Sequence, residues 1–179
     1  MAYFPLFVNL EGKKVLIVGG GSVALRKSQV LADTGASITV ITPGRPENFA
    51  SATVINRKFT EDDIKGFDIV IGATDDSALN EKISLACRAQ GIPVNIVDDE
   101  KKSDFIFPAV ARRGDVVAGI STGGKCPALA KKIRDDVLSI LPTEEEAAPV
   151  YAFREELKTA EADSGKRRER LERYINENL

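Results

Sequence analysis

Three small residues at fixed spacing point to nucleotide chemistry. Gly19, Gly21 and Ala24 fit the pattern G-x-G-x-x-A. In this pattern the first glycine makes a tight turn, the second lets a pyrophosphate approach the backbone, and the small third residue lets a helix pack closely on a strand. The N–H groups at the start of that helix then attract a phosphate. A glycine turn can also be a simple tight connection, so its neighbours decide between the two interpretations.

The flanking residues favour the nucleotide-binding interpretation. Residues 15–18 form an apolar, largely β-branched run that is typical of a buried strand, and the residues after the turn place apolar side chains near helical spacing. A second apolar run at 37–41 completes a β-α-β unit. The sequence therefore predicts a dinucleotide site at this turn.

Proton transfer must be carried out without histidine, because the chain has none. A carboxylate, Lys, Tyr, Cys or the cofactor itself must serve near neutral pH. Ligands of open parallel sheets lie outside the carboxyl ends of the strands. Three carboxylates, at 98–100, follow the short predicted strand 94–97 and are therefore expected at the cleft. Asp99 and the nearby Asp104 also have simpler roles open to them. Asp99 could cap a turn, and Asp104 could pair with a lysine.

The run at 67–73 ends in a second polar cluster. By the same rule, Thr74 and Asp75 should edge the cofactor cleft. The alternative is that Asp75, Asp76 or Ser77 caps a helix over 78–90 and does no more.

The segment after the second strand departs from the usual NAD pattern. An acidic residue is expected there to hold the ribose hydroxyls, but the chain has Thr42, Pro43 and Gly44. Thr42 or the backbone of the next two residues could hold the ribose instead. Arg45 could favour a 2′-phosphate, so the choice between NAD and NADP stays open.

A second glycine-rich loop, at 121–127, contains Lys125 and precedes a helix expected to run from Pro127 to about residue 140. Such a loop can hold an anion with its N–H groups. Basic residues also crowd the middle third of the chain, which indicates either a solvated face or a site for a polyanion. They are Lys101, Lys102, Arg112, Arg113, Lys125, Lys131, Lys132 and Arg134.

Bulk properties narrow the function classes. The 179 residues are 43% hydrophobic with a formal charge of −2, and nothing global points to nucleic acid. No apolar run is long enough to span a bilayer and no secretion signal is present, so we expect a cytoplasmic protein without a membrane partner. No Cys or His cluster has metal-ligand spacing, so no metal ligand is predicted.

The predicted fold class is α/β, with a Rossmann-like doubly wound parallel sheet followed by a small α+β segment and a helical C-terminal region. The apolar lead-in at 3–10 should pack along the sheet edge or cross the domain. Residues 104–110 and 116–121 should form an antiparallel pair, and the C-terminal helices should break near 164–165.

Five blocks of sequence together resemble the precorrin-2 dehydrogenase family of siroheme synthesis, which includes the dehydrogenase and ferrochelatase module of siroheme synthase. The blocks are residues 4–7, 19–27, 73–76, 95–109 and 121–130. The resemblance covers roughly residues 3–142, and the chain looks like the stand-alone form. It implies an NAD-binding domain over 1–112, a dimerisation segment over 113–142 and a helical region over 143–179.

The resemblance implies NAD-dependent oxidation of precorrin-2 to sirohydrochlorin by a homodimer, in some members followed by insertion of ferrous iron. Asp98 matches the proposed catalytic aspartate of the family. The cofactor-binding positions of the family match Ser22, Val23, Pro43 and Gly44. They add to the cofactor-binding residues that the glycine pattern and the strand ends predict, which are Gly19, Gly21, Ala24, Thr74 and Asp75. The substrate-binding positions are Ser121, Gly123, Gly124, Lys125 and Cys126, and many relatives have serine in place of Cys126.

Two rival functions remain at this stage. One is a regulatory domain that senses NAD(H) and catalyses no reaction. Only the first glycine turn supports this function. The other is a general NADP-dependent reductase of small molecules. The resemblance leaves open whether the chain also inserts iron or cobalt.

Overall fold

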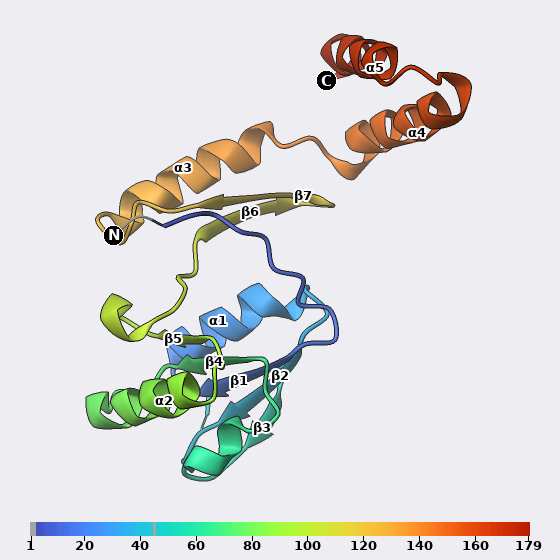
Figure 1. The fold of residues 1–179 in the computed structure, drawn as a ribbon. Coiled ribbons are helices and arrows are strands. Elements are labelled where there is room, and N and C mark those ends of the chain that lie inside the picture. The colour runs from blue at the N-terminus through green and yellow to red at the C-terminus, as the bar shows by residue number, and fades with distance from the viewer. Residues whose placement is uncertain (1–2, 45) are drawn as a thin grey trace. The chain divides into compact units, whose positions relative to one another are not determined.

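The computed structural model describes residues 3–44 and 46–179 and divides the chain into two compact units (Figure 1). The first, which we call the sheet unit, is Leu6–Phe107. The second, the hairpin unit, is Pro108–Leu179 together with the N-terminal residues up to Pro5. Among the described residues, no helix has the length and apolar character needed to cross a membrane.

The sheet unit is built on five parallel strands in the order β3-β2-β1-β4-β5, which confirms the predicted doubly wound sheet. The strands are β1 (Lys14–Val18), β2 (Ser37–Ile41), β3 (Thr53–Ile55), β4 (Ile69–Gly72) and β5 (Val94–Ile96). Val18 at the end of β1 pairs with Ile41 of β2 and with Gly72 of β4. The carboxyl ends of these three strands are therefore level, and the strand order reverses between β1 and β4.

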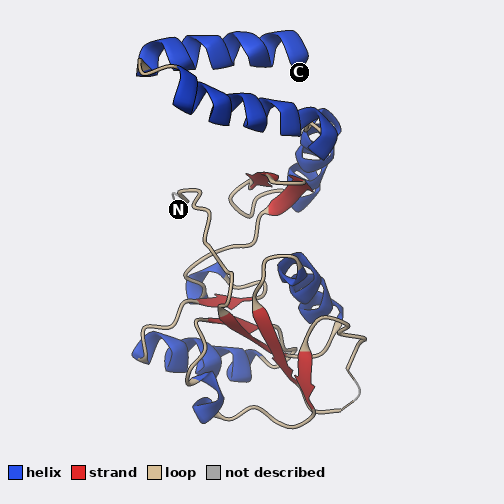
Figure 2. Ribbon diagram, turned by 90° about the vertical axis from the view of Figure 1, so that its right-hand side faces the viewer, coloured by secondary structure: helices blue, strands red, loops and turns tan. Residues whose placement is uncertain are grey.

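Alternate side chains of the strands face two separate cores, because successive residues of a strand point to opposite faces. Leu16 and Val18 pack with the face covered by α2 (Ser77–Ala89) and the 3₁₀ turn η1 (Glu61–Ile64). Val15 and Ile17 pack with the face covered by α1 (Ser22–Ala32) (Figure 2). Burial on both faces explains why these strands read as continuous apolar runs.

The segment after β5 differs from the prediction. Residues 103–108 are not a strand, and the 3₁₀ turn η2 (Glu100–Lys102) precedes them. They are tied to β5 by hydrogen bonds, of which the Asp104 N–H donates to the Val94 carbonyl at 2.8 Å. The Asp104 carboxylate accepts a hydrogen bond from the Val94 N–H group. Its ion-pair partner is Arg88 rather than the lysine that was expected.

The hairpin unit begins with the antiparallel pair β6 (Ala109–Arg113) and β7 (Val116–Ile120), as predicted. The helix α3 (Pro127–Ile140) packs along this hairpin. Two further helices, α4 (Glu144–Ala160) and α5 (Ser164–Asn178), pack on each other through stacked rings of Phe153 and Tyr174, whose centroids lie 4.3 Å apart. The break between them falls at 161–163, because Asp163 caps α5 and draws 164–165 into its first turn.

The lead-in does not bury its apolar side chains. Leu6, Phe7 and Val8 are between 66% and 77% exposed, and the nearby Leu10 is the residue that packs against the α1-side core. The expectation that this segment packs along the sheet edge is therefore wrong for these three side chains, and the alternative, that the segment crosses the domain, stays a prediction.

Candidate active site

A cavity of about 800 Å³ opens at the carboxyl ends of β1, β2 and β4 in the sheet unit. It brings together eight of the predicted residues: Gly19, Gly21, Ser22, Val23, Pro43, Thr74, Asp75 and Asp98. Ala24 and Gly44 are not among its lining residues. Ala24 is fully buried in the core between α1 and the sheet, where its small side chain allows close packing.

Gly19 makes the turn out of β1 in a conformation that needs glycine. Its φ is +124°, and a Cβ there would collide with the carbonyl of Ala73, which follows β4. Its N–H donates to the Ile41 carbonyl at 2.9 Å. The backbone of β1 and the backbone after β4 therefore meet at this point without space for a side chain.

The next two glycines differ from each other. A Cβ at Gly20 would lie 2.6 Å from Thr42 Oγ1, so this glycine packs against the end of β2, a requirement that the motif does not predict. A Cβ at Gly21 would meet nothing within 4 Å, and the backbone there is extended, with φ −86° and ψ −177°. Gly21 thus faces open space on the cavity side, where a pyrophosphate could lie against the backbone.

Two helices begin at this cavity, and they differ at their N-termini. The first hydrogen bond of α1 runs from Leu25 N–H to the Gly21 carbonyl, and Gly21 has no side chain to satisfy the N–H groups before it. In α2, Asp76 accepts from the N–H groups of Ala78 and Leu79 at 2.9 and 3.0 Å. The start of α1 is therefore open to a phosphate and the start of α2 is already capped.

The segment after β2 is held by Asn56. The Gly44 N–H donates to Asn56 Oδ1 at 3.1 Å, and the Thr42 N–H donates to the Ile55 carbonyl. Thr42 is buried, with its hydroxyl 3.4 Å from the Pro43 carbonyl. Arg45, the candidate for a 2′-phosphate contact, lies outside the described residues.

The polar turn after β4 is fixed by a residue that the sequence did not single out. Asn80, buried on α2, accepts from the Thr74 hydroxyl at 2.8 Å and donates to the Thr74 carbonyl at 2.9 Å. This pair of bonds holds Thr74 at the cavity edge beside the exposed Asp75.

Asp98 occupies a tight turn directly after β5. The Asp99 N–H donates to the Ile96 carbonyl at 3.3 Å, and Asp98 has φ +60°, a conformation that aspartate and asparagine tolerate better than most residues. Asp99 caps η2 by accepting from Lys101 and Lys102 N–H groups. Burial raises the pKa of Asp99, but hydrogen bonds led by that from Lys102 outweigh it and lower the pKa overall. Within the described ranges, the Asp98 carboxylate accepts no such bond, and it lines the cavity.

Sequence reasoning missed several cavity-lining residues, among them Lys58, Phe59, Leu79 and Lys82. The first two follow β3 and the others lie on α2. They carry no motif, and their only signal is that they follow the carboxyl end of a strand or begin the helix beyond it.

The second glycine-rich loop belongs to the hairpin unit, between β7 and α3, and all five predicted substrate-binding residues are exposed there. Gly123 and Gly124 have φ of +61° and +76°. Ser121 Oγ accepts from Gly123 N–H at 3.0 Å, and Thr122 Oγ1 accepts from Cys126 N–H at 3.1 Å. Cys126 precedes α3 without a side-chain cap, so the first N–H groups of that helix are available to an anion.

Metal ligation has no candidate site in residues 3–44 and 46–179, where no group of three or more Cys, Asp or Glu side chains could hold an ion. Both cysteines are free, Cys87 buried and Cys126 exposed. Desolvation raises the pKa of Cys87 to about 11, and the charge of Asp104 adds to the effect.

Comparisons with known proteins agree with this geometry. A family model described as "Putative NAD(P)-binding" matches residues 6–109. The siroheme synthase of Ectopseudomonas mendocina is 41% identical over 146 residues, which are 79% of this chain and 32% of that protein. The siroheme synthase of Pseudomonas entomophila is 38% identical over 176 residues, 94% of this chain and 38% of that protein.

The chain therefore spans about a third of the length of these curated relatives. A solved structure titled "SirC, precorrin-2 dehydrogenase" has a TM-score of 0.79 and 25% identity, covering 97% of this chain and 89% of that one. The likeness to SirC extends through both units.

Proposed function

This chain belongs to the NAD(P)-binding family matched at residues 6–109, and from that premise we propose that it oxidises precorrin-2 to sirohydrochlorin with NAD as the hydride acceptor. The observation that carries the proposal is the likeness to a precorrin-2 dehydrogenase over 97% of this chain, hairpin unit included. A regulatory nucleotide-binding domain would need the sheet unit alone.

The cavity suits a dinucleotide in its own right. Its volume of about 800 Å³ is in the range of small-molecule sites. We propose that the open backbone at Gly21 and the free N–H groups of Ser22 and Val23 hold the pyrophosphate. Thr42 and Pro43, which line the cavity, then border the adenosine ribose, and Thr74 and Asp75 border the other half.

Oxidation of the macrocycle removes a hydride and a proton. NAD, when bound, supplies the hydride acceptor. We propose that Asp98 accepts the proton, because of the three carboxylates at 98–100 it is the one that lines the cavity, and no backbone N–H group of the described residues donates to it. Asp98 lies in the turn after β5 with φ +60° and lines the cavity.

The test is anaerobic incubation of the protein with precorrin-2 and NAD, following NADH and sirohydrochlorin absorbance together. Asp98→Asn should lower turnover at least about a hundredfold while NAD binding stays unchanged. Asparagine tolerates the positive φ, so the turn survives the change. The matched control is Glu100→Gln, an exposed carboxylate two residues away, which should keep normal turnover. Normal turnover by Asp98→Asn contradicts the assignment of the base.

We propose that the loop at 121–126 binds carboxylates of the substrate. Support comes from its exposed Lys125, its two glycines with positive φ and the uncapped start of α3. Lys125→Met should raise the KM for precorrin-2 about tenfold with a smaller change in kcat. Lys131→Met, an exposed lysine on α3, is the control, and an equal effect of both variants contradicts the proposal.

We further propose a homodimer formed through α3. One face of α3 packs on the hairpin. Away from the hairpin, α3 carries an exposed apolar stripe of Leu129, Ile133 and Ile140 at spacings of four and seven residues. Light scattering should give a dimer for the wild-type chain and a monomer for Ile133→Glu. Lys131→Glu changes charge outside the stripe and should remain dimeric.

Ferrous iron is a second substrate to test rather than a resident metal. The described residues contain no preassembled ligand group for it. Adding ferrous iron to sirohydrochlorin with and without the protein separates enzymatic insertion, which gives a faster siroheme spectrum with protein, from the uncatalysed reaction.

A further inference from the structure

The cavity at the carboxyl ends of the strands has an uneven distribution of charge. After β4 and β5 it is lined by three carboxylates and a lysine of α2, which are Asp75, Asp76, Asp98 and Lys82. After β2 and β3, Lys58 alone is charged among the described residues that line it. The half of the cavity beside β2 and β3 therefore favours an additional negative charge, and the half beside β4 and β5 opposes one.

The Lys58 ammonium is not committed to a carboxylate. Within residues 3–44 and 46–179, no carboxylate lies within ion-pair distance of it. Its neighbour Arg57 is engaged, because the guanidinium donates two hydrogen bonds to the Asp63 carboxylate, at 2.7 and 2.6 Å. Arg57 also donates to the Lys58 carbonyl at 3.0 Å, which fixes the backbone at Lys58. Of these two adjacent cations, Lys58 is thus the one that can meet a ligand.

Hydrogen bonds join the segment after β3 to the segment after β2. The Thr42 N–H donates to the Ile55 carbonyl at 3.2 Å, and the Gly44 N–H donates to Asn56 Oδ1 at 3.1 Å. Lys58 follows Asn56 by two residues and lines the same cavity as Thr42. The lysine therefore belongs to the side of the cavity on which a dinucleotide-binding fold places the adenosine ribose.

The cavity lining after β2 has no carboxylate of the kind that selects against a 2′-phosphate. In NAD-selective folds of this type, an acidic side chain there binds the ribose hydroxyls, whereas a nearby cation accommodates the 2′-phosphate of NADP. The described residues after β2 are Thr42, Pro43 and Gly44. The next carboxylate along the chain is that of Glu47, whose N–H donates to the Gly20 carbonyl at 3.1 Å and which is not among the lining residues. The described lining therefore offers a 2′-phosphate an attraction without the usual repulsion.

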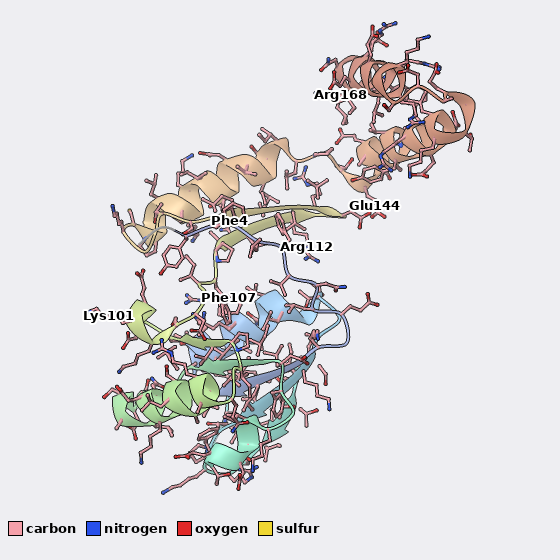
Figure 3. The ribbon with its side chains drawn as sticks, viewed as in Figure 1. Phe4, Lys101, Phe107, Arg112, Glu144 and Arg168 are labelled. Atoms are coloured by element: carbon pink, nitrogen blue, oxygen red, sulfur yellow. The ribbon has the colours of Figure 1, made fainter. Side chains whose placement is uncertain are left out.

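Apolar surface for an adenine ring lies next to Lys58. Phe59 and Leu79 both line the cavity, and both pack against the α2-side core. Phe59 comes shortly before η1, and η1 lies beside α2, which carries Leu79 (Figure 3). A cation beside an apolar surface suits a ligand that joins a flat ring to a phosphorylated ribose.

We propose that the adenosine half of this cavity accepts a 2′-phosphate, so that the protein binds NADP as well as NAD, and that Lys58 is the residue that holds this phosphate. The proposal rests on the proposed function in taking the cavity as the dinucleotide site, and it extends the cofactor range of that site. Lysine suits this task because its ammonium has three donors and binds phosphate as a point charge. The two cofactors differ only in the 2′-phosphate, so the ratio of their affinities reports this contact.

The first test measures binding without turnover. Calorimetric titration compares NAD with NADP, and adenosine 5′-phosphate with adenosine 2′,5′-bisphosphate, a pair that lacks the nicotinamide. In the wild-type protein the Kd for NADP should be no more than about threefold above that for NAD, and the bisphosphate should bind at least about threefold more tightly than the monophosphate. A larger preference for NAD, or a bisphosphate that binds no better than the monophosphate, overturns the proposal.

The second test uses variants to assign the phosphate to Lys58. Lys58→Met should weaken NADP binding about tenfold and change the Kd for NAD by less than about twofold, and Lys58→Arg should keep NADP binding. Lys65→Met is the matched control, because Lys65 is exposed, follows in the same segment and lies outside the cavity lining. Glu47→Gln should leave the ratio of the two Kd values unchanged. An equal loss of NAD and NADP binding in Lys58→Met, or a several-fold gain of NADP binding in Glu47→Gln, overturns the proposal.

Failure of this proposal and failure of the proposed function give different results. If precorrin-2 is oxidised with NAD and NADP is excluded, the proposed function stands and the 2′-phosphate site fails. If precorrin-2 is not oxidised while NADP binding depends on Lys58, the 2′-phosphate site stands and the proposed function fails. If neither dinucleotide binds, both fail.

Discussion

Two neighbouring glycines of the cofactor turn should respond in opposite ways to the addition of one methyl group. Gly19→Ala places a Cβ against the Ala73 carbonyl in a backbone with φ +124°. Gly21→Ala places the same atom in open space with φ −86°. The first change is predicted to damage the fold and the second to damage cofactor binding.

The magnitudes follow from these surroundings. A residue with a side chain in this region of φ costs about 1–3 kcal/mol, and forcing a methyl group against backbone costs a further 1–3 kcal/mol or so. Gly19→Ala should therefore lower the free energy of unfolding by about 2–6 kcal/mol, a large part of the roughly 5–15 kcal/mol of an ordinary domain. At Gly21, the N-cap of α1, a small loss of capping is offset by reduced entropy of the unfolded chain, for a net change within about 1 kcal/mol.

NAD binding, unlike stability, should be weakened strongly by Gly21→Ala. Its methyl group occupies the space assigned to the pyrophosphate, and the Kd for NAD should rise at least about tenfold, which corresponds to about 1.4 kcal/mol. Calorimetric titration measures this directly. The wild-type chain and an exposed-site variant such as Glu100→Gln serve as references.

Unfolding of the sheet unit can be followed by itself. The chain has no tryptophan, but Cys87 is fully buried in the α2-side core of this unit. In a Cys126→Ser background, the urea concentration at which Cys87 becomes reactive reports the sheet unit alone. Equal destabilisation by both glycine variants, or unchanged NAD binding by Gly21→Ala, refutes the assigned roles of the two glycines.

Three further predictions concern other parts of the sheet unit. Asp76→Ala removes the cap of α2 and should lower the free energy of unfolding by about 1 kcal/mol in the same thiol assay. The side-chain hydrogen bond from Arg57 lowers the pKa of Asp63 to about 2. Its stabilisation, of about 2 kcal/mol, should be present above pH 4 or so and lost toward pH 2, and Asp63→Asn should flatten stability over that interval. In the native protein at pH 8, a disulfide reagent should react with Cys126 and spare Cys87, whose pKa is raised to about 11; rapid reaction of Cys87 contradicts its burial.

The sheet could be predicted from sequence because each of its strands carries a local signal. The runs that became β1 and β4 are largely apolar on both faces, and the runs of all three strands β1, β2 and β4 end at glycine or polar clusters. The residues after β5 gave the wrong prediction, since apolar Phe105 and Phe107 resemble a strand. Their conformation depends instead on side-chain bonds from Asn95 and Asp104 to partners about ten residues away, which no local period reveals.

Site residues divide in the same way. Gly19 and Gly21 are recognisable because their spacing reflects backbone requirements within one short turn. Asn80, which fixes Thr74, and Lys58, which lines the cavity from beyond β3, act through the tertiary fold. Nothing in their neighbouring residues distinguishes them from ordinary helix and loop positions.

The paired carboxylates after β4 and β5 show how the fold assigns tasks to identical side chains. Asp75-Asp76 and Asp98-Asp99 each follow a strand and precede a helical turn. In each pair the second aspartate accepts hydrogen bonds from two backbone N–H groups of that turn. The first is left without a protein donor in the described ranges and lines the cavity. Because a helix start must satisfy its N–H groups, the cap position is fixed by where the helix begins, and the residue before it becomes available to a ligand.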